Sequence, residues 1–427
     1  MAKHKKKKPN RQLSDKIIKA QARNEFYRRL KKMLKAIDCE GVFDLISPKL
    51  LDLLFNARGF PINVLGSEEN TFDTDDLKWF KKGVNYHFKT KMIDLELGGS
   101  KIDLYTISSI GIPLVIYAIP IIEQSLVKHP HFQEKLKRFK DSPKPLDYII
   151  DYLWEITEYM CFLMSDLRTR IYWTNNASQS DDEKLQLGFN LTIHGEIPEK
   201  TYVTINHDKH IASRVGWTLD LKPVWQSIKP EKLGLRSVGK DNTIDVYIQD
   251  HALNRITERN DCVYIQYLWI WLNISVADTK YHINEVTGKY MIDFRVYDVK
   301  TGYLVAQIID AKLIIQTFLL LTNDGTPEGK KLHANTGLSK ADKEYLRLDR
   351  LSTFASPEVQ CNQKIRGIFK EAGCDSLFHL KAELDKHHIM LKNPASASLI
   401  EDYLMMNEEK DKEMEWDDAC EENYSNA

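Results

Sequence analysis

The chain has few of the residues that interrupt regular structure, and few cysteines. Its 427 residues include 19 glycines, 14 prolines and 6 cysteines. This low glycine and proline content argues against a largely disordered chain, and the length suffices for two or three hydrophobic cores. The cysteines are far apart and form no CxxC pair, and no apolar secretory segment follows the N-terminus. We therefore expect reduced thiols in a cytoplasmic protein.

The signatures of several common enzyme classes are also missing. The chain contains no GxxxxGK[ST] phosphate loop, no GxGxxG after a strand, no GxSxG elbow and no HExxH helix. Nucleotide hydrolysis, dinucleotide redox chemistry, serine hydrolysis and zincin proteolysis therefore lack their usual marks. Histidines gather at residues 207–210 and 387–388, but without companion groups at metal-site spacing. We expect neither a metal nor another cofactor.

Only one long stretch, residues 104–122, lacks charged side chains. Its length alone would suffice to span a bilayer. However, Gly111, Pro113 and Pro120 interrupt it, and it has neither a basic flank nor a second such segment to pack against. We expect a buried helix or a broken helix pair here, and no membrane span.

The net charge of −1 hides two oppositely charged ends. Residues 1–35 contain 14 Lys and Arg against two acidic residues, whereas residues 407–427 contain nine Asp and Glu against two lysines. A basic arm favours phosphate backbones through counterion release, although a solvated terminus explains the same composition. The acidic tail is either solvated or a competitor for a basic groove. The arm residues expected to bind nucleic acid are Lys5, Lys6, Lys7, Lys8 and Arg11.

Apolar spacing divides the chain into segments. Residues 1–40 are predicted to form a basic arm and an amphipathic helix, and residues 41–180 an all-helical domain. A change to alternating apolar residues predicts a small β subdomain over 181–240, in which residues 185–193 and 201–207 form a hairpin. Residues 336–406 are predicted to be helical again, before the acidic tail.

Residues 241–335 have the most specific order of elements. A strand (243–249) is followed by a charged helix (250–260), an apolar helix (262–276) and four strands in an antiparallel meander, with turns at 287–288, 300–302 and 310–312. A turn-rich loop with Lys330 and Lys331 ends the meander. The predicted fold class is α+β: an all-helical N-terminal domain, a small β subdomain, a β-α-α-β4 unit and C-terminal helices.

The helix at 250–260 carries four ionisable side chains on one face. His251, Arg255, Glu258 and Arg259 stand at i, i+4, i+7 and i+8, so they project within a sector of roughly 100°. Apolar residues lie on the opposite side. Such a face is either a solvated salt-bridge surface or a functional site.

The pattern HAxxRxxER at 251–259, between a strand and a second helix that leads to a four-stranded meander, resembles a known family. It is similar to the RelE-like ribonuclease domains of the superfamily that contains barnase, EndoU and colicin nucleases, and most to bacterial domains whose first helix carries HAxxRxxER. The resemblance covers about residues 241–335. It implies metal-independent cleavage of RNA, in a toxin or defence role, by attack of the 2′-OH on the adjacent phosphate.

The resemblance also implies roles for individual residues. His251 would act as the base, kept neutral by Arg255. Arg255 and Arg259 would hold the phosphate, and Glu258 would orient them. Thr322, or else Thr317, would present a hydroxyl from the last strand.

RNA is accordingly the expected partner, with Lys330 and Lys331 adding phosphate contacts. The alternative is a non-catalytic adaptor or nucleic-acid-binding protein whose helical N-terminal domain offers a partner surface. In that case Arg255 and Glu258 would be paired with residues outside their helix and closed to solvent, and an open groove lined by His251, Arg255, Arg259 and Lys330 would count against it. The sequence does not indicate an oligomeric state.

Overall fold

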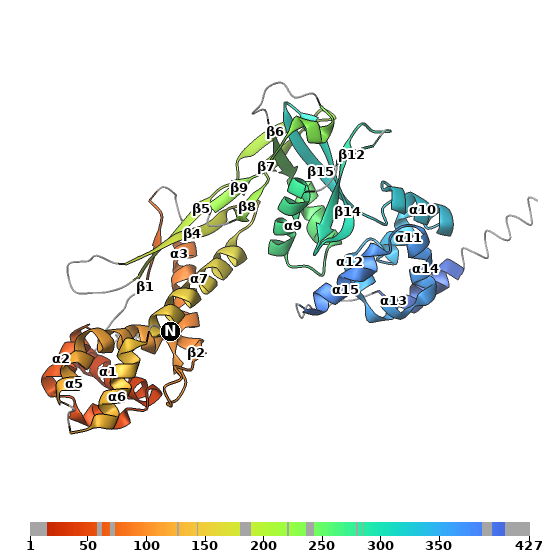
Figure 1. The fold of residues 1–427 in the computed structure, drawn as a ribbon. Coiled ribbons are helices and arrows are strands. Elements are labelled where there is room, and N and C mark those ends of the chain that lie inside the picture. The colour runs from red at the N-terminus through yellow and green to blue at the C-terminus, as the bar shows by residue number, and fades with distance from the viewer. Residues whose placement is uncertain are drawn as a thin grey trace, which may run out of the picture. The chain divides into compact units, whose positions relative to one another are not determined.

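The structure is a computed structural model and describes residues 15–57, 62–68, 73–125, 128–142, 144–179, 189–219, 222–235, 243–278, 281–284, 286–386 and 395–405. The chain forms two compact units, each considered by itself. Unit 1 consists of Met1–Leu163 and Tyr172–Gly195, and unit 2 of Met164–Ile171 and Glu196–Ala427. The fold is mixed α and β, with helices at the N-terminus and a large mixed sheet (Figure 1).

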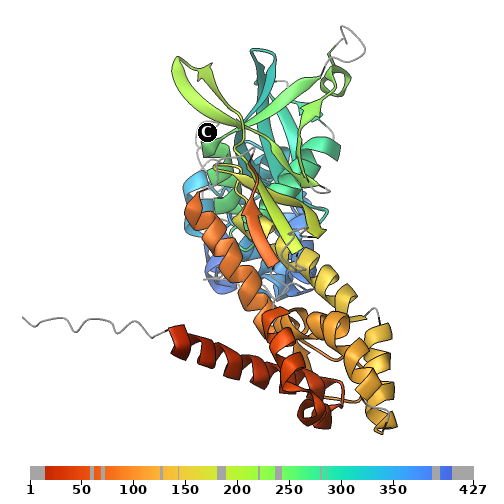
Figure 2. The ribbon, with the colours of Figure 1, turned by 90° about the vertical axis from the view of Figure 1, so that its left-hand side faces the viewer.

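Unit 1 is built mainly from helices. Helix α1 (Asp15–Ala36) packs through Phe26, Leu30 and Leu34, which are almost completely buried. Residues four apart lie on one helical face, so this spacing produces a buried stripe. Residues 17–20 are exposed, and Figure 2 shows this end of α1 extending beyond the other helices of the unit. Those are η1 (Glu40–Leu45), α2 (Pro48–Ala57), α3 (Thr74–Thr90), α6 (Pro130–Asp141), α7 (Lys144–Met164) and the run described next.

Residues 104–122 lie within one continuous helical run. It comprises α4 (Leu104–Thr106), two π-helical segments, η2 (Ile107–Gly111) and η3 (Leu114–Ala118), and α5 (Ile119–Ser125). In the described part of the chain, Leu104–Ile122 is the one helix long and apolar enough to cross a membrane, by length and composition, and 56% of an 18-residue apolar stretch within it is buried. Core helices meet the same criterion, and the burial agrees with the expected buried helix.

Unit 1 also contains strands, so the prediction of an all-helical domain over residues 41–180 was wrong. Strands β1 (Ile62–Gly66), β5 (Phe189–Glu196) and β4 (Ile171–Gln179) form a three-stranded sheet in that order, and β2 (Met92–Ile93) pairs with β3 (Ile102–Asp103). β1 runs parallel to β5, with Val64 opposite Leu191. A run as short as β1 carries no clear periodicity, and its partner is distant in sequence.

Unit 2 is organised around an eight-stranded sheet. Seven strands lie in the order β12-β13-β14-β15-β11-β7-β6, and β10 pairs with β11. Their bounds are β6 (Lys200–Ile205), β7 (Asp208–Arg214), β10 (Ser227–Ile228), β11 (Ile244–Gln249), β12 (Tyr281–Ile283), β13 (Tyr290–Val296), β14 (Val299–Ile309) and β15 (Lys312–Leu320). A separate hairpin of β8 (Gly216–Leu219) and β9 (Lys222–Trp225) and the turn η4 (Pro230–Leu233) complete this part.

The predicted meander is confirmed. β12, β13, β14 and β15 are antiparallel neighbours in chain order, and β11 runs parallel to β15, with Val246 opposite Leu313. The turn expected at residues 300–302 instead lies at Tyr297 and Asp298, both with positive φ. Gly302 is inside β14, where an added Cβ would lie 2.1 Å from the carbonyl oxygen of Leu319. This glycine permits close strand packing and forms no turn.

In the described parts of 181–240, residues 189–219 and 222–235, the strands do not form the expected separate β subdomain. β5 does not form a hairpin with β6, because β5 pairs in the sheet of unit 1 while β6 and β7 extend the large sheet of unit 2 beyond β11. Alternating apolar residues identify strands, but they leave the pairing partner undetermined.

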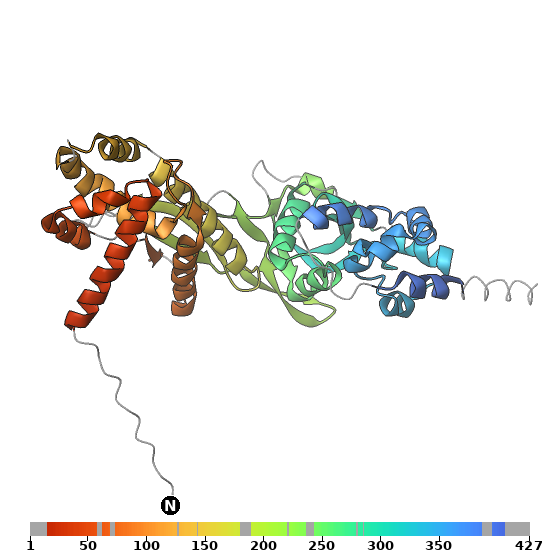
Figure 3. The same cartoon turned by 90° about the horizontal axis from the view of Figure 1, so that it is seen from below.

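Two helices cover one face of the large sheet. Helix α8 (Asp250–Arg259) packs against β15 through Ala252, Leu253 and Ile256, all fully buried, and α9 (Ile265–Asp278) packs against β13. The C-terminal helices form a group beside the sheet (Figure 3). They are α10 (Pro327–Thr336), α11 (Lys340–Tyr345), α12 (Leu351–Ala355), α13 (Pro357–Cys361), α14 (Gln363–Glu371) and α15 (Ser376–Lys386).

Candidate functional site

The charged face of α8 is present as the sequence predicted, but its members differ in their surroundings. His251 is exposed and, within the described residues, has no hydrogen-bond partner. One turn further, Arg255 donates to Glu258, with Nη1 2.7 Å from Oε2. Both of these side chains are 36% exposed. The first half of the face is therefore accessible, while the second half is occupied by contacts within the protein.

Glu258 is held by an arginine from outside its helix. Nη2 of Arg350 lies 2.7 Å from Oε1 of Glu258, and Arg350 also donates to the backbone carbonyl of Glu258. Burial by itself would raise the pKa of Glu258, but the three neighbouring arginines outweigh it and keep the pKa below its usual value. Glu258 thus stays ionised, and its charge is compensated by arginines of α8 and by Arg350.

Arg259 forms an ion pair with Asp349, and the two side chains are only 13% and 18% exposed. Nearby, Asp261 accepts two hydrogen bonds from Ser352, one from its backbone N–H at 3.0 Å and one from its hydroxyl at 2.8 Å. The end of α8 is therefore fastened to residues 349–352 by several polar contacts. Arg259 is thus largely buried and bound to a carboxylate of the protein itself.

Thr322, predicted to assist catalysis, is 1% exposed, and its hydroxyl donates to the carbonyl of Leu348 at 2.7 Å. The structure brings Thr322 and Arg259 together around one small cavity of about 30 Å³. That volume holds about one water molecule. His251, Arg255 and Glu258 do not line this cavity, so it does not bring the five predicted catalytic residues together and is too small to admit a nucleotide.

Lys330 and Lys331 were expected in a loop, but they lie on α10, both exposed. Thr326 caps this helix by accepting from the backbone N–H of Gly329 at 2.9 Å, which explains why the helix begins within a turn-rich sequence. The predicted arm residues Lys5 to Arg11 lie outside the described residues.

A second candidate site was not predicted from the sequence. It is a cavity of about 380 Å³ in unit 1, called the basic pocket below. α1 contributes three of its cations, α3 contributes one, and the start of α4 forms the remaining wall. Its lining residues are Arg28, Arg29, Lys32, Lys89, Asp103, Tyr105 and Thr106.

Asp103 anchors one side of the basic pocket. Its carboxylate caps α4, accepting from the backbone N–H of Thr106 at 2.8 Å and from the Thr106 hydroxyl at 2.9 Å, and Lys32 Nζ lies 2.6 Å away. Burial would raise the pKa of Asp103, but the hydrogen bonds from Lys32 and Thr106 outweigh it and lower the pKa. Asp103 therefore stays charged and fixes Lys32 at the pocket.

The two arginines of the basic pocket share one carboxylate. Arg28 and Arg29 donate to Glu25 at 2.7 to 2.9 Å, and these bonds lower the pKa of Glu25 to about 2. The guanidinium of Arg29 also lies 4.6 Å from the centre of the Tyr105 ring, and Lys89 Nζ 5.2 Å from it. Among the described residues Lys89 forms no ion pair. The Tyr105 ring thus contacts one cation from α1 and one from α3.

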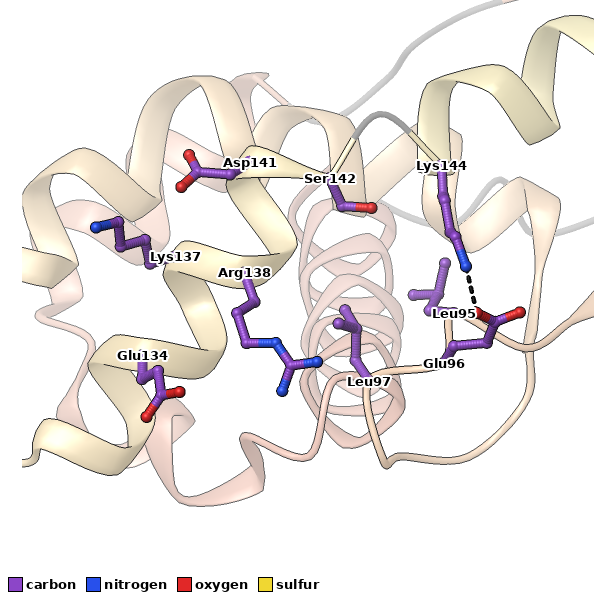
Figure 4. A pocket seen from close by; sticks show the side chains of 9 residues that line it. All are labelled: Leu95, Glu96, Leu97, Glu134, Lys137, Arg138, Asp141, Ser142 and Lys144. Carbon is purple, nitrogen blue, oxygen red and sulfur yellow. Dashed lines mark hydrogen bonds and ion pairs between the residues drawn. The ribbon is translucent and has the colours of Figure 1, made fainter.

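The charges of this group do not cancel. Arg28, Arg29, Lys32 and Lys89 carry four positive charges, and the ionised Glu25 and Asp103 carry two negative charges, which leaves +2. A larger cavity of about 590 Å³ in unit 1 has no such excess, since Lys137, Arg138 and Lys144 face three acidic residues. In Figure 4, Lys144 points to Glu96, its ion-pair partner, and Arg138 toward Leu97. The basic pocket is therefore the stronger candidate for binding an anion.

Part of the basic pocket could have been recognised from sequence. Arg28, Arg29 and Lys32 stand at helical spacing on the predicted amphipathic helix, which places them on one face. The packing of α3 and α4 against α1 brings Lys89 and Tyr105 to this face, and no local pattern encodes that. Among the described residues, no group of three or more His, Cys, Asp or Glu is placed to hold a metal ion.

The chain matches no known protein family, no curated protein and no solved structure. The likeness to RelE-like ribonucleases remains a prediction that depends on residues 251–259 and on the order of the elements that surround them.

Proposed function

We propose that the protein is a non-catalytic nucleic-acid-binding protein that holds RNA by its phosphates on unit 1. The observation that carries the proposal is the basic pocket, where four cations meet two carboxylates. Cationic contacts to phosphates supply much of the affinity of nucleic-acid-binding proteins and need no base-specific group. RNA is chosen as the nucleic acid because of the resemblance in unit 2.

The rest of α1 supports this assignment. The helix carries eight Lys and Arg against two acidic residues, and its 22 residues span about 33 Å at 1.5 Å per residue. Its exposed start follows directly on the basic residues 1–14 of the sequence. A straight basic element of this length can contact several successive phosphates of one strand.

The surroundings of α8 support a non-catalytic role. Glu258 and Arg259 are bound to Arg350 and Asp349, and Thr322 is buried against a backbone carbonyl. Arg259 and Asp349 are only 13% and 18% exposed, so a substrate phosphate that displaced Asp349 would leave its carboxylate buried without a partner. Glu258 is thus paired outside α8 as the adaptor hypothesis expects, whereas Arg255 pairs within its own helix, with Glu258, and both side chains are 36% exposed.

Metal-independent cleavage of RNA is the second candidate. It is favoured by one observation, the exposed His251 one turn before the partly exposed Arg255. A base and one cation on an accessible helix face are the minimum for 2′-OH activation. The cleavage experiment in the Discussion distinguishes the two candidates.

Binding is tested with the full chain and a fluorescently labelled single-stranded RNA, by anisotropy at several salt concentrations. We expect log K to fall linearly with log salt, by about 0.7 for each phosphate neutralised. Lys89→Gln should weaken binding at low salt and reduce that slope. Lys89 is exposed and has no ion pair among the described residues, so this change should leave the fold intact.

The matched control is Lys81→Gln, an exposed lysine on the same helix α3 that does not line the basic pocket. It removes the same charge and should leave affinity and slope nearly unchanged. RNA binding that is absent at 50 mM salt, or that both variants weaken equally, would contradict the assignment to this pocket.

A further inference from the structure

The shape of the basic pocket is more specific than backbone binding requires. Exposed cations on an open surface suffice to contact the phosphates along a strand. The basic pocket is instead a cavity of about 380 Å³ with walls from three elements, α1, α3 and the start of α4. This volume lies in the range of small-molecule sites, about 300 to 1,000 Å³. A group that enters the cavity must protrude from its carrier, as a chain end or a small ligand does.

The charge of the pocket indicates which protruding group fits. The ionised Glu25 and Asp103 leave an excess of +2 among the pocket cations. A phosphate monoester carries about −1.5 to −2 at neutral pH, whereas a backbone phosphodiester carries a single negative charge. A monoester therefore compensates the excess, and a diester leaves about half of it uncompensated.

The donors also suit a terminal phosphate. A monoester presents three terminal oxygens. Nε and Nη2 of Arg28 and Nε of Arg29 bond Glu25, so the N–H groups at the remaining guanidinium nitrogens are the ones that can donate to these oxygens. Lys89 supplies an ammonium from the opposite helix. The ring of Tyr105 holds Arg29 and Lys89 near one another, so these two side chains are partly ordered before a ligand binds. This lowers the entropy cost of binding.

We propose that the basic pocket binds a phosphate monoester. This inference rests on the proposed function, because it assigns a ligand to the same basic region. The monoester is either the 5′-phosphate at the end of an RNA or the phosphate of a free nucleotide. Both have the same chemistry at the pocket, so the experiment must separate them.

The experiment uses the full chain and four probes. Adenosine and adenosine 5′-monophosphate are compared by calorimetry, and two 3′-labelled RNA oligomers, identical except for a 5′-phosphate or a 5′-hydroxyl, are compared by anisotropy. If the RNA end is the ligand, the phosphorylated oligomer should bind about 10-fold more tightly, as one or two extra charge-assisted hydrogen bonds would give. Lys89→Gln should remove this preference, and Lys81→Gln should retain it.

Each other outcome has a distinct meaning. If adenosine 5′-monophosphate binds while adenosine does not, and the two oligomers bind equally, the pocket takes a free nucleotide. If both oligomers bind equally and the monophosphate does not bind, the monoester inference is overturned while RNA binding stands. If neither oligomer binds, the proposed function fails. Binding of adenosine 5′-monophosphate would then still support the monoester inference, and its failure to bind would overturn it. Lys32→Gln is a second variant of the pocket, but it removes the partner of Asp103. Its folding is therefore verified by circular dichroism first. If Lys32→Gln is unfolded, the conclusion depends on Lys89→Gln alone.

Discussion

Glu258 accepts a hydrogen bond from Arg350, with 2.7 Å between Oε1 and Nη2, although the two residues lie 92 positions apart in the chain. Glu258 was expected to orient the arginines of its own helix. It bonds one of them, Arg255, and also fastens α8 to the segment that precedes α12. The charged face of α8 therefore joins the sheet and the C-terminal helices of unit 2.

Arg350→Ala is expected to lower the free energy of unfolding by about 1–3 kcal/mol, because the half-buried Glu258 loses a charged donor. Urea unfolding followed by circular dichroism measures this change. Lys370→Ala, at an exposed lysine of α14, should change it by less than about 0.5 kcal/mol. In a double-mutant cycle with Glu258→Gln we expect a coupling of at least about 0.5 kcal/mol, and additive effects would show that the contact contributes nothing.

RNA incubated with the protein in metal-free buffer is expected to stay intact, because Glu258, Arg259 and Thr322 are engaged within the protein. A gel of end-labelled RNA checks this. The decisive variant is His251→Ala, with His282→Ala as a control at another exposed histidine. Cleavage by the wild type that His251→Ala abolishes and His282→Ala retains would establish the ribonuclease candidate instead.

Asp103 should make unit 1 sensitive to acid. Its pKa is lowered from the ordinary 3.8 in the folded state, so its contribution is complete above about pH 4 and is lost as pH falls through the lower folded value. Asp103→Asn should therefore cost about 1–3 kcal/mol at neutral pH, and the difference from the wild type should shrink toward pH 2. Urea unfolding across this range measures it, and a difference that does not depend on pH would contradict the ion pair with Lys32.

Gly302→Ala should destabilise unit 2 by at least about 2 kcal/mol, since the new Cβ would meet the Leu319 carbonyl at 2.1 Å and the Phe318 ring at 2.7 Å. Gly367→Ala serves as the control, because its Cβ would meet nothing within 4 Å on helix α14. That change should stabilise the helix by about 0.5–1 kcal/mol. Thermal unfolding compares the two, and equal shifts would refute the close strand packing at Gly302.

The sequence predicted the elements of unit 2 because their signals are local. Alternating apolar residues identified the meander, and Ala252, Leu253 and Ile256 identified the buried side of α8. Gly302 misled the prediction because glycine occurs both in turns and where strands pack closely. The start of α10 was missed because Thr326 and Pro327 are typical of loops as well as of helix caps.

The candidate sites were harder to predict because their partners are remote in sequence. The spacing on α8 gave the charged residues, but not that Arg350 and Asp349 would bind them. Likewise, α1 showed its basic residues, whereas Lys89 joins them only through tertiary packing. Residue types and helical spacing predict which side chains share a helix face. The rest of the fold determines which residues contact that face.

The pairing of Val64 with Leu191 has a consequence for synthesis of the chain. β1 leaves the ribosome long before β5, so its backbone hydrogen-bonding groups have no strand to pair with while the intervening helices are made. Non-local parallel pairing of this kind closes a long loop and folds slowly. An open strand edge is also a template for other chains. Unit 1 should therefore be most prone to aggregate in nascent chains that end before residue 189.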